Sequence, residues 1–302
     1  MFGRVPNLFG KNFITSFLFS AALFVTASCY IFLTFLSPQE LIAFILNQDI
    51  LKYSTYLTVI SLFFAVFLQI ANGEIIRIME GYGILNPFKL VAWVEIRRFR
   101  KLYEEIRKVK KECRENKNNL SVALRQKRNK LMMLKINRFP DEERWLLPTS
   151  FGNTMRAFEV YSRLMYGADA ILLWIRLLAV IPEEYLKFIE SAKAQLDIWV
   201  SFWFLSILLI VEYLGLVVYT KEITSFWIFF ILICITFFSF SRARFAAKNW
   251  GEFIKASFDL YLPSLKEQLK LDQITDDALW SKYSQAIIYA IPSKLPKETN
   301  EN

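Results

Sequence analysis

Long apolar runs alternate with a charged central block along this chain of 302 residues. Residues 13–36 carry no charge, and a helix of that length spans roughly 36 Å at 1.5 Å per residue, enough to cross a hydrocarbon core of about 30 Å. Similar apolar runs occur at 53–71, 198–219 and 224–241. The pattern therefore predicts an all-α protein with four membrane spans and a helical cytoplasmic domain.

The charged block begins with a segment that predicts a helical hairpin. From about 87 to 115, apolar side chains recur three and four residues apart, as one face of a helix requires. Asn and Lys residues at 116–119 interrupt the pattern, and a second charged helix is expected at 121–137. The stripe on the first helix consists of Phe99, Leu102, Ile106, Val109 and Cys113. We expect the two helices to fold back as an antiparallel pair.

These elements divide the chain into four expected parts. The first membrane helix pair falls in 1–81, and a cytoplasmic helical domain with the basic hairpin falls in 82–195. A second membrane hairpin follows in 196–241, and cytoplasmic C-terminal helices with a tail occupy 242–302. The third span is expected to continue a helix that starts near Pro182, because acidic residues there favour the positive end of a helix.

The C-terminal part alternates apolar and charged residues at helical spacing over about 249–269. We expect a further cytoplasmic helix there and a short one near 278–289. The turn that joins the third and fourth spans is expected at 220–223.

Positive charge fixes the expected orientation. The block at 82–195 has 23 Lys and Arg against 13 Asp and Glu, a net charge of +10, whereas the loop at 37–53 has one Lys and two acids. Loops rich in Lys and Arg stay in the cytoplasm. We therefore expect a multi-pass protein of the bacterial inner (plasma) membrane with both termini in the cytoplasm.

The basic residues of the hairpin and of the segment after the fourth span are expected at the lipid surface, where anionic headgroups attract them. Clustered Lys and Arg also form the electrostatic footprint of nucleic-acid binding. We favour the lipid surface over nucleic acid, because acids alternate with bases along the hairpin and topology accounts for the excess. The residues assigned to this surface are Arg97, Arg98, Lys101, Lys108, Lys111, Arg242 and Arg244.

The composition is typical of a membrane protein and excludes several kinds of catalytic and metal site. Apolar residues make up 55% and aromatic residues 17% of the chain, more bulky apolar surface than a soluble domain needs. The absence of His excludes histidine-based metal sites, general bases and catalytic triads. Cys29, Cys113 and Cys234 lie in separate segments and predict neither a disulfide framework nor a zinc site. We expect no enzyme activity and no cofactor or metal.

Glu212 places a carboxylate inside the third apolar run. A charge near the centre of a span costs roughly 2.5 kcal/mol or more, so such a group normally faces a partner, water or a pathway. Two interpretations stay open: Glu212 is a pore or oligomer contact, or it is satisfied locally or extends toward the interface. For Glu74, next to the end of the second span, we favour a solvated boundary charge over such a contact.

The stretch 147–182 is the least generic part of the chain. Thr149 or Ser150 is expected to cap a helix that continues to about Gly167, and Asp169 is expected to cap the next helix. That second helix is apolar enough to lie in the membrane interface but too short to span it.

The same stretch carries a set of polar residues that could form a cytoplasmic site. Arg156, Glu159 and Arg163 fall three and four residues apart, which are positions for local salt bridges. We favour a cluster that holds two capped helices together, and the alternative is a nucleotide or ligand pocket that uses two arginines. The candidate residues are Asn153, Arg156, Glu159, Asp169 and Arg176.

A recurring pattern of residues covers about 30 positions of this stretch. It has the form P-T-x-x-G-N-x-x-R-A-x-E, then Y-G-x-D-A, then W-x-R-L, and here consists of Pro148, Thr149, Gly152, Asn153, Arg156, Ala157, Glu159, Tyr166, Gly167, Asp169, Ala170, Trp174, Arg176 and Leu177. In this pattern the chain resembles a family of uncharacterised membrane proteins, mainly from actinobacteria and cyanobacteria, which implies no established function. The order of two spans, cytoplasmic helices and two spans is similar to bestrophin-type anion channels in architecture alone, since the second span has no matching pore motif.

The leading functional hypothesis is an oligomeric ion channel or membrane-perturbing effector that is gated by its cytoplasmic helices. It rests on Glu212, on helices that continue out of the spans and on the absence of catalytic motifs. Such long helices pack well around a symmetry axis, so we expect a homo-oligomer. The alternative is a non-conducting scaffold that binds cytoplasmic partners or anionic lipids. The expected partners are the lipid bilayer, further copies of the chain, and a cytoplasmic protein or small-molecule ligand.

Overall fold

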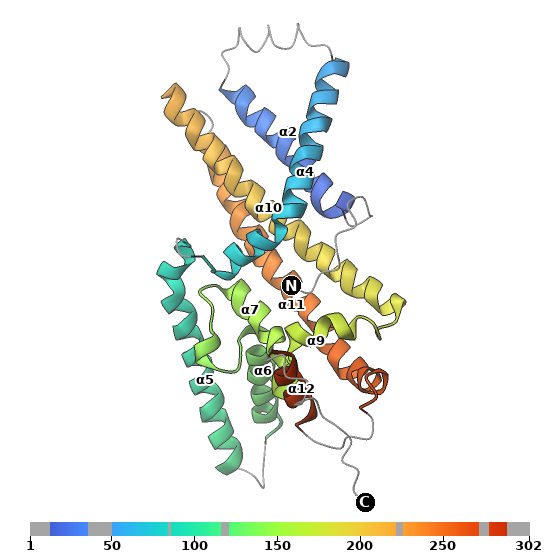
Figure 1. Cartoon of the computed structure of the whole chain (residues 1–302). Coiled ribbons are helices and arrows are strands. Elements are labelled where there is room, and N and C mark those ends of the chain that lie inside the picture. The colour runs from blue at the N-terminus through green and yellow to red at the C-terminus, as the bar shows by residue number, and fades with distance from the viewer. Residues whose placement is uncertain are drawn as a thin grey trace, which may run out of the picture. The chain divides into compact units, whose positions relative to one another are not determined.

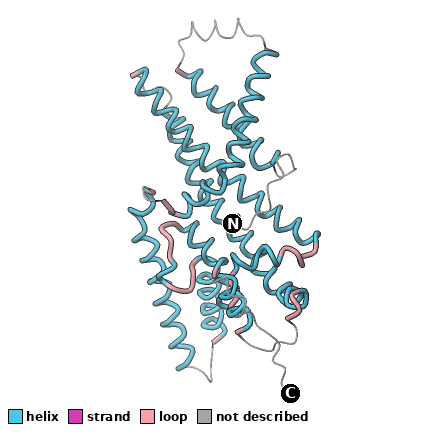
Figure 2. The backbone as a smooth tube through the Cα atoms, in the orientation of Figure 1, coloured by secondary structure: helices cyan, strands magenta, loops and turns pink. Residues whose placement is uncertain are grey.

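The structure is a computed structural model that describes residues 13–35, 50–83, 86–115, 121–221, 226–271 and 278–288. All regular secondary structure within these ranges is helical, and no strand occurs in them (Figure 2). The all-α prediction is confirmed for the described part of the chain.

Four helices are long and apolar enough to cross a membrane, as the hydropathy pattern predicted. The first is α2 (Phe19–Thr34), which continues from a single π-helical turn, η1 (Ile14–Leu18). The others are α4 (Ile50–Glu80), α10 (Glu183–Thr220) and α11 (Phe226–Gln268) (Figure 1). The last three have lengths of about 46, 57 and 64 Å at 1.5 Å per residue, more than a hydrocarbon core of about 30 Å requires.

One helix boundary differs from the sequence prediction. A separate helix was expected over 249–269, but α11 runs without interruption from the fourth apolar run through that segment. Pro263 lies inside this helix. Basic residues after a span do not end a helix, because Lys and Arg are good helix formers. Of the turn expected at 220–223, residues 220 and 221 are described and residues 222 and 223 lie outside the described residues, which resume at Phe226.

The chain divides into two compact units. The unit we call the charged unit contains Arg77–Ile189 and Ala247–Asn302, together with the first two residues. The apolar unit contains Gly3–Ile76 and Glu190–Ala246. Helices α4, α10 and α11 each have residues in both units.

The charged unit contains the predicted hairpin. A short 3₁₀ helix, η2 (Pro87–Val91), leads into α5 (Ala92–Glu115), which packs along α6 (Val122–Arg138) (Figure 1). The apolar stripe of α5 is buried against Phe139, with Leu131 and Met132 of α6 beside it. Stripe residues Phe99, Leu102, Ile106 and Val109 are all at most 8% exposed.

Three short helices follow the hairpin and a single 3₁₀ turn, η3 (Glu143–Trp145). They are α7 (Ser150–Glu159), α8 (Tyr161–Tyr166) and α9 (Ala170–Leu177), and α12 (Leu279–Ile288) contacts the last two. The single helix expected up to Gly167 is therefore two helices, which are separated at Val160. Helix α9 buries Leu173, Trp174 and Leu177, while Ile175 on its other side is 75% exposed.

The apolar unit is built from aromatic contacts and a few internal hydrogen bonds. Phe24 packs on Phe64 with ring centroids 4.8 Å apart, which joins α2 to α4. The Ser16 hydroxyl donates to the carbonyl of Ala194 at 3.1 Å. Small residues and hydroxyls at such contacts let apolar helices approach closely.

Candidate functional site

Helix α4 ends in a tight turn at Gly81, whose φ of +100° is a left-handed conformation that favours glycine. The Gly81 amide donates to the carbonyl of Ile78, and the Tyr82 amide donates to that of Arg77 at 2.9 Å. The Asn86 side chain donates a further hydrogen bond to Ile78. These bonds satisfy carbonyls that have no partner inside the helix, so α4 stops at a defined residue.

The start of the 147–182 stretch packs directly onto this helix end. Thr149 caps α7 by accepting from the amide of Gly152 at 2.8 Å, and its hydroxyl donates to the carbonyl of Met79 at 2.7 Å. A Cβ on Gly152 would lie 2.4 Å from the backbone oxygen of Glu80. The absence of a side chain at position 152 is therefore what lets α7 reach the backbone of α4.

Asn153 anchors the chain segment that precedes α7. Its side chain is fully buried, accepts from the Leu147 amide at 2.7 Å and donates to the Leu147 carbonyl at 3.0 Å. It also lies 3.4 Å from the carboxylate of Glu95, which is 4% exposed and paired with Arg98. Asn153 thus links α7 to the start of α5, and each of its side-chain atoms has a partner, as buried polar groups require.

Arg156 contacts a tyrosine and an acid at the centre of this arrangement. Arg156 donates to the hydroxyl of Tyr82 and lies 3.4 Å from the carboxylate of Glu159. Glu80, the last residue of α4, is 7% exposed and belongs to the charged unit, beyond the apolar run that ends near Ala71. We call Glu80, Tyr82, Arg156 and Glu159 the helix-end cluster.

The helix-end cluster is poised to bind a proton. Burial, and then the neighbouring Glu159 carboxylate, raise the pKa of Glu80 from its ordinary value of 4.5 to about 7, against the opposing effect of Arg156. Burial also raises the pKa of Glu159. The nearby guanidinium groups of Arg156 and Arg77 favour the charged carboxylate of Glu80, but burial has the larger effect, so the pKa of Glu80 stays raised. Nothing in this geometry resembles a nucleophile paired with a base.

The remaining predicted residues of the stretch hold its second half in place. Asp169 caps α9 by accepting from the amides of Ile171 and Leu172, which confirms the predicted cap, and it pairs with Arg163. Arg163 thus pairs with Asp169 six residues on, and not with the helix neighbours that the spacing suggested. Arg176 donates to the carbonyl of Leu172 in its own helix at 2.8 Å.

The structure therefore divides the five candidate residues into two groups. Asn153, Arg156 and Glu159 lie together at the end of α4, whereas Asp169 and Arg176 belong to α9. Arg156 bonds to Tyr82 and pairs with Glu159, whereas Arg176 donates to a carbonyl of its own helix, so the two arginines have no partner in common among these contacts. A pocket that uses both arginines finds no support in these contacts.

Glu212 has a partner within the apolar unit. Its carboxylate accepts a hydrogen bond from the hydroxyl of Ser28 at 2.7 Å, which joins α10 to α2. Of the two interpretations left open by the sequence, this contact favours local satisfaction. Glu74 lies on the exposed side of α4.

One set of polar contacts in the apolar unit was not predicted from the sequence. Asp197, which is 9% exposed, accepts from the amide nitrogen of Asn72 at 2.9 Å and pairs with Lys193 one helical turn away. It joins α4 to α10 at the ends of two apolar runs. The side-chain oxygens of Gln69 and Asn72 are buried and have no partner within the described residues.

The basic residues assigned to a lipid surface are mostly exposed, and several have local partners. Arg97 stacks over the Trp93 ring at 4.4 Å, and Arg242 lies 5.5 Å from the Trp199 ring centroid. Lys111 lies 3.8 Å from the carboxylate of Glu115. Lys101 and Lys108 are exposed on α5 and Arg98 pairs with Glu95, whereas Arg244 on α11 is partly buried.

Sequence reasoning missed Glu80, Tyr82 and Glu95. Each is brought to α7 by the fold across more than fifty positions of sequence, and none has a local pattern that marks it. The two glycines on either side of Tyr82 are a local signal for the end of a helix, but they do not indicate what packs there.

No metal-binding group of three or more His, Cys, Asp or Glu side chains occurs in the part of the chain that the structure describes. Comparison of the chain with models of protein families, with curated proteins and with solved structures gave no match.

Proposed function

We propose that the protein is a homo-oligomeric ion channel or membrane-perturbing effector of a bacterial inner membrane, with both termini in the cytoplasm, and that its charged unit gates it. The observation that carries this proposal is the end of α4. One continuous helix contains an apolar run of membrane-spanning length and ends in the helix-end cluster.

The helix-end cluster supports gating because it lies at the end of the same helix, α4, that contains the apolar run. Thr149 and Gly152 hold the last turn of α4, and Arg156 holds Tyr82 directly after it. A change of charge at Glu80 alters the contacts of that turn. A continuous helix transmits such a change along its axis, since its turns are joined by hydrogen bonds.

The test is ion flux through proteoliposomes that contain the purified full-length protein, recorded between pH 5.5 and pH 8. We expect flux that changes over this range in the wild type, and a shifted pH response in Tyr82→Phe, which removes the hydroxyl bonded by Arg156. Tyr30→Phe is the matched control, because Tyr30 is 62% exposed on α2 and belongs to the other unit. Its pH response should equal that of the wild type.

A bilayer that stays impermeable in every condition, with folded protein in it, overturns the channel proposal. The second candidate, a non-conducting scaffold, is favoured by the hydrogen bond between Glu212 and Ser28, which gives the intramembrane carboxylate a structural role. Glu212→Ala separates the two candidates: changed ion selectivity supports a channel, and lost stability with unchanged permeability supports a scaffold.

A further inference from the structure

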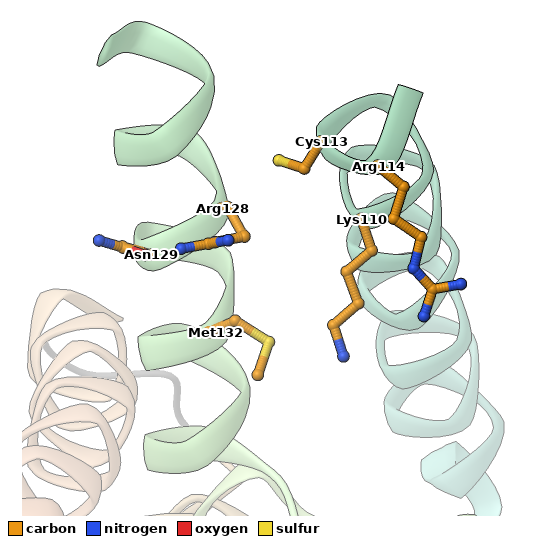
Figure 3. A pocket seen from close by; sticks show the side chains of 6 residues that line it. All are labelled: Lys110, Cys113, Arg114, Arg128, Asn129 and Met132. Carbon is orange, nitrogen blue, oxygen red and sulfur yellow. The ribbon is translucent and has the colours of Figure 1, made fainter. Parts of the chain in front are cut away.

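A pocket of about 540 Å³ opens between the two helices of the hairpin, close to the end where they are joined (Figure 3). Helix α5 contributes Lys110, Cys113 and Arg114, and helix α6 contributes Arg128, Asn129 and Met132. Lys110, Cys113 and Met132 point into the space between the helices (Figure 3). The pocket lies entirely within the charged unit.

The lining combines three cations with no acid. Lys110 and Arg114 belong to α5 and Arg128 belongs to α6; the Lys110 side chain faces the space between the helices, whereas the Arg114 guanidinium and the Asn129 amide lie on the outer sides of their helices (Figure 3). Cys113 and Met132 supply the apolar part of the lining. Such a set complements an anion with several oxygen atoms, since Arg binds phosphate and carboxylate through paired N–H groups and Lys adds a point charge.

These three cations lack the local acids that other basic residues of the hairpin have. Residues three and four positions away from Lys110, Arg114 and Arg128 are apolar, uncharged or basic, so no intrahelical salt bridge is available to them. By contrast, Lys111 has Glu115 one turn away and Arg98 has Glu95. Among the described residues, no ion pair involves any of the three pocket cations.

The second helix of the hairpin adds to this excess of basic over acidic residues. Helix α6 has no acidic residue, and its basic residues are Arg125, Lys127, Arg128, Lys130, Lys135 and Arg138. A positive surface of this kind repels a second copy of itself and attracts anions.

We propose that this pocket is a binding site for a phosphate-bearing anion, carried either by a small soluble molecule or by a lipid headgroup. The inference does not depend on whether the protein conducts ions, because it rests on the hairpin alone. A bound phosphate ester neutralises cations of both helices at once and so holds the two helices together near the end where they are joined.

The experiment uses Cys113 as a reporter inside the pocket. The full-length protein carries Cys29→Ser and Cys234→Ser, so Cys113 is the single thiol, and its rate of alkylation by N-ethylmaleimide is measured. One arm adds inorganic pyrophosphate to the protein in neutral detergent. The other places the protein in nanodiscs of phosphatidylcholine with or without phosphatidic acid. Protection by pyrophosphate identifies a soluble ligand, and protection by phosphatidic acid alone identifies a lipid headgroup.

Two triple variants with the same change in net charge serve as test and control. Lys110→Gln with Arg114→Gln and Arg128→Gln removes the pocket cations, whereas Lys101→Gln with Lys111→Gln and Lys127→Gln removes three cations outside the pocket. We expect the pocket variant to weaken ligand affinity by about tenfold or more, and the control variant to retain it. Arg128→Lys keeps the positive charge and is the control for a variant that fails to fold. We expect it to retain part of the protection of Cys113 by the ligand.

Three outcomes overturn the proposal. The first is no protection of Cys113 by either probe. The second is equal loss of protection in both triple variants, which means general attraction of anions to the hairpin. The third is protection by single-stranded oligonucleotide in the absence of any effect of pyrophosphate or phosphatidic acid, which identifies a nucleic-acid surface instead.

Discussion

Two regions of the charged unit handle excess charge in opposite ways. At the end of α4, Glu80 and Glu159 lie in a largely buried setting, where Arg156 pairs with Glu159. At the pocket of the hairpin, Lys110, Arg114 and Arg128 are among the lining residues, which include no acid. The first region lowers its charge by taking up a proton, whereas the second keeps its charge and leaves neutralisation to solvent ions or a ligand.

The difference follows from solvent access. Two unit charges at 4 Å interact by about 1 kcal/mol in water and by about 4 kcal/mol at an effective dielectric constant of 20. Excess charge is therefore tolerated on the open hairpin but is costly beside Glu80, which is 7% exposed. Burial, and not the number of charged residues, decides which region is sensitive to pH.

The largest effect is expected from Gly152→Ala. The added methyl group would lie 2.4 Å from the backbone oxygen of Glu80, so the two helices must separate, at a cost of about 3 kcal/mol or more in the free energy of unfolding. Denaturant titration in detergent, followed by tryptophan fluorescence, measures this. Gly215→Ala is the matched control, because a Cβ at that position meets nothing within 4 Å. The control should be neutral or slightly stabilising, by up to about 1 kcal/mol. Equal costs for the two variants would contradict the close approach.

The next effect is a dependence of stability on pH that Glu80 creates. Because its pKa in the folded protein is about 7 and its ordinary value is 4.5, the folded state binds more protons between these values. Stability should be highest below pH 4.5, fall as the pH rises to about 7, and then level off. The upper limit of this loss is about 3 kcal/mol, from 1.36 kcal/mol per unit of pKa.

Glu80→Gln should remove most of this slope and make the protein more stable than the wild type at pH 8. Unfolding of both proteins at pH 5 and pH 8 measures it, and Glu74→Gln on the exposed side of α4 is the control. If the dependence of stability on pH remained in Glu80→Gln, the group that binds the proton would be Glu159, because burial also raises the pKa of Glu159.

A smaller effect is expected from Thr149→Val. The change removes the cap of α7 and the hydrogen bond to Met79, which together should lower stability by about 1 to 2 kcal/mol. Thr58→Val is the matched control, because the Thr58 hydroxyl is exposed and bonds only to the carbonyl of Ser54 in its own helix. A cost at Thr58 as large as that at Thr149 would show that the link to α4 contributes nothing.

The smallest effect on stability is expected at the pocket. Neutralising Lys110, Arg114 and Arg128 together should change the free energy of unfolding by less than about 0.5 kcal/mol without a ligand, because none of them has a paired acid to lose. Arg156→Gln, which removes the cation paired with Glu159, should cost clearly more at pH 8. If neutralising the three pocket cations lowered the free energy of unfolding as much as Arg156→Gln does, the two regions would not differ in the way described above.

Local patterns predicted the apolar helices, the hairpin and the cap of α9. The apolar stripe beginning at Phe99 predicted the hairpin, the cap at Asp169 followed from residue type and position, and Thr149 was one of two residues expected to cap α7. These features depend on neighbours within a turn or two, where spacing in the sequence and distance in space agree.

The contacts that define the candidate site were not predictable in this way. Glu80 meets Gly152, and Tyr82 meets Arg156, only because the fold returns α7 to the end of α4. Burial of a carboxylate is a property of that packing and leaves no periodic trace in the sequence. The continuity of α11 was missed for a related reason, since a change from apolar to basic composition alters the surroundings of a helix without ending it.

The close approach of α7 to α4 also restricts how this protein can diverge among its descendants. Gly81 faces Pro148, whose ring atoms would lie within 2.9 Å of an added Cβ, and Gly152 faces the backbone of Glu80. A lineage that replaces either glycine must reshape the opposite segment at the same time. Homologues that keep this arrangement should therefore retain both glycines even where Glu80 and Glu159 have changed, and the two positions offer a stricter test of common ancestry than the apolar runs, which many unrelated membrane helices share.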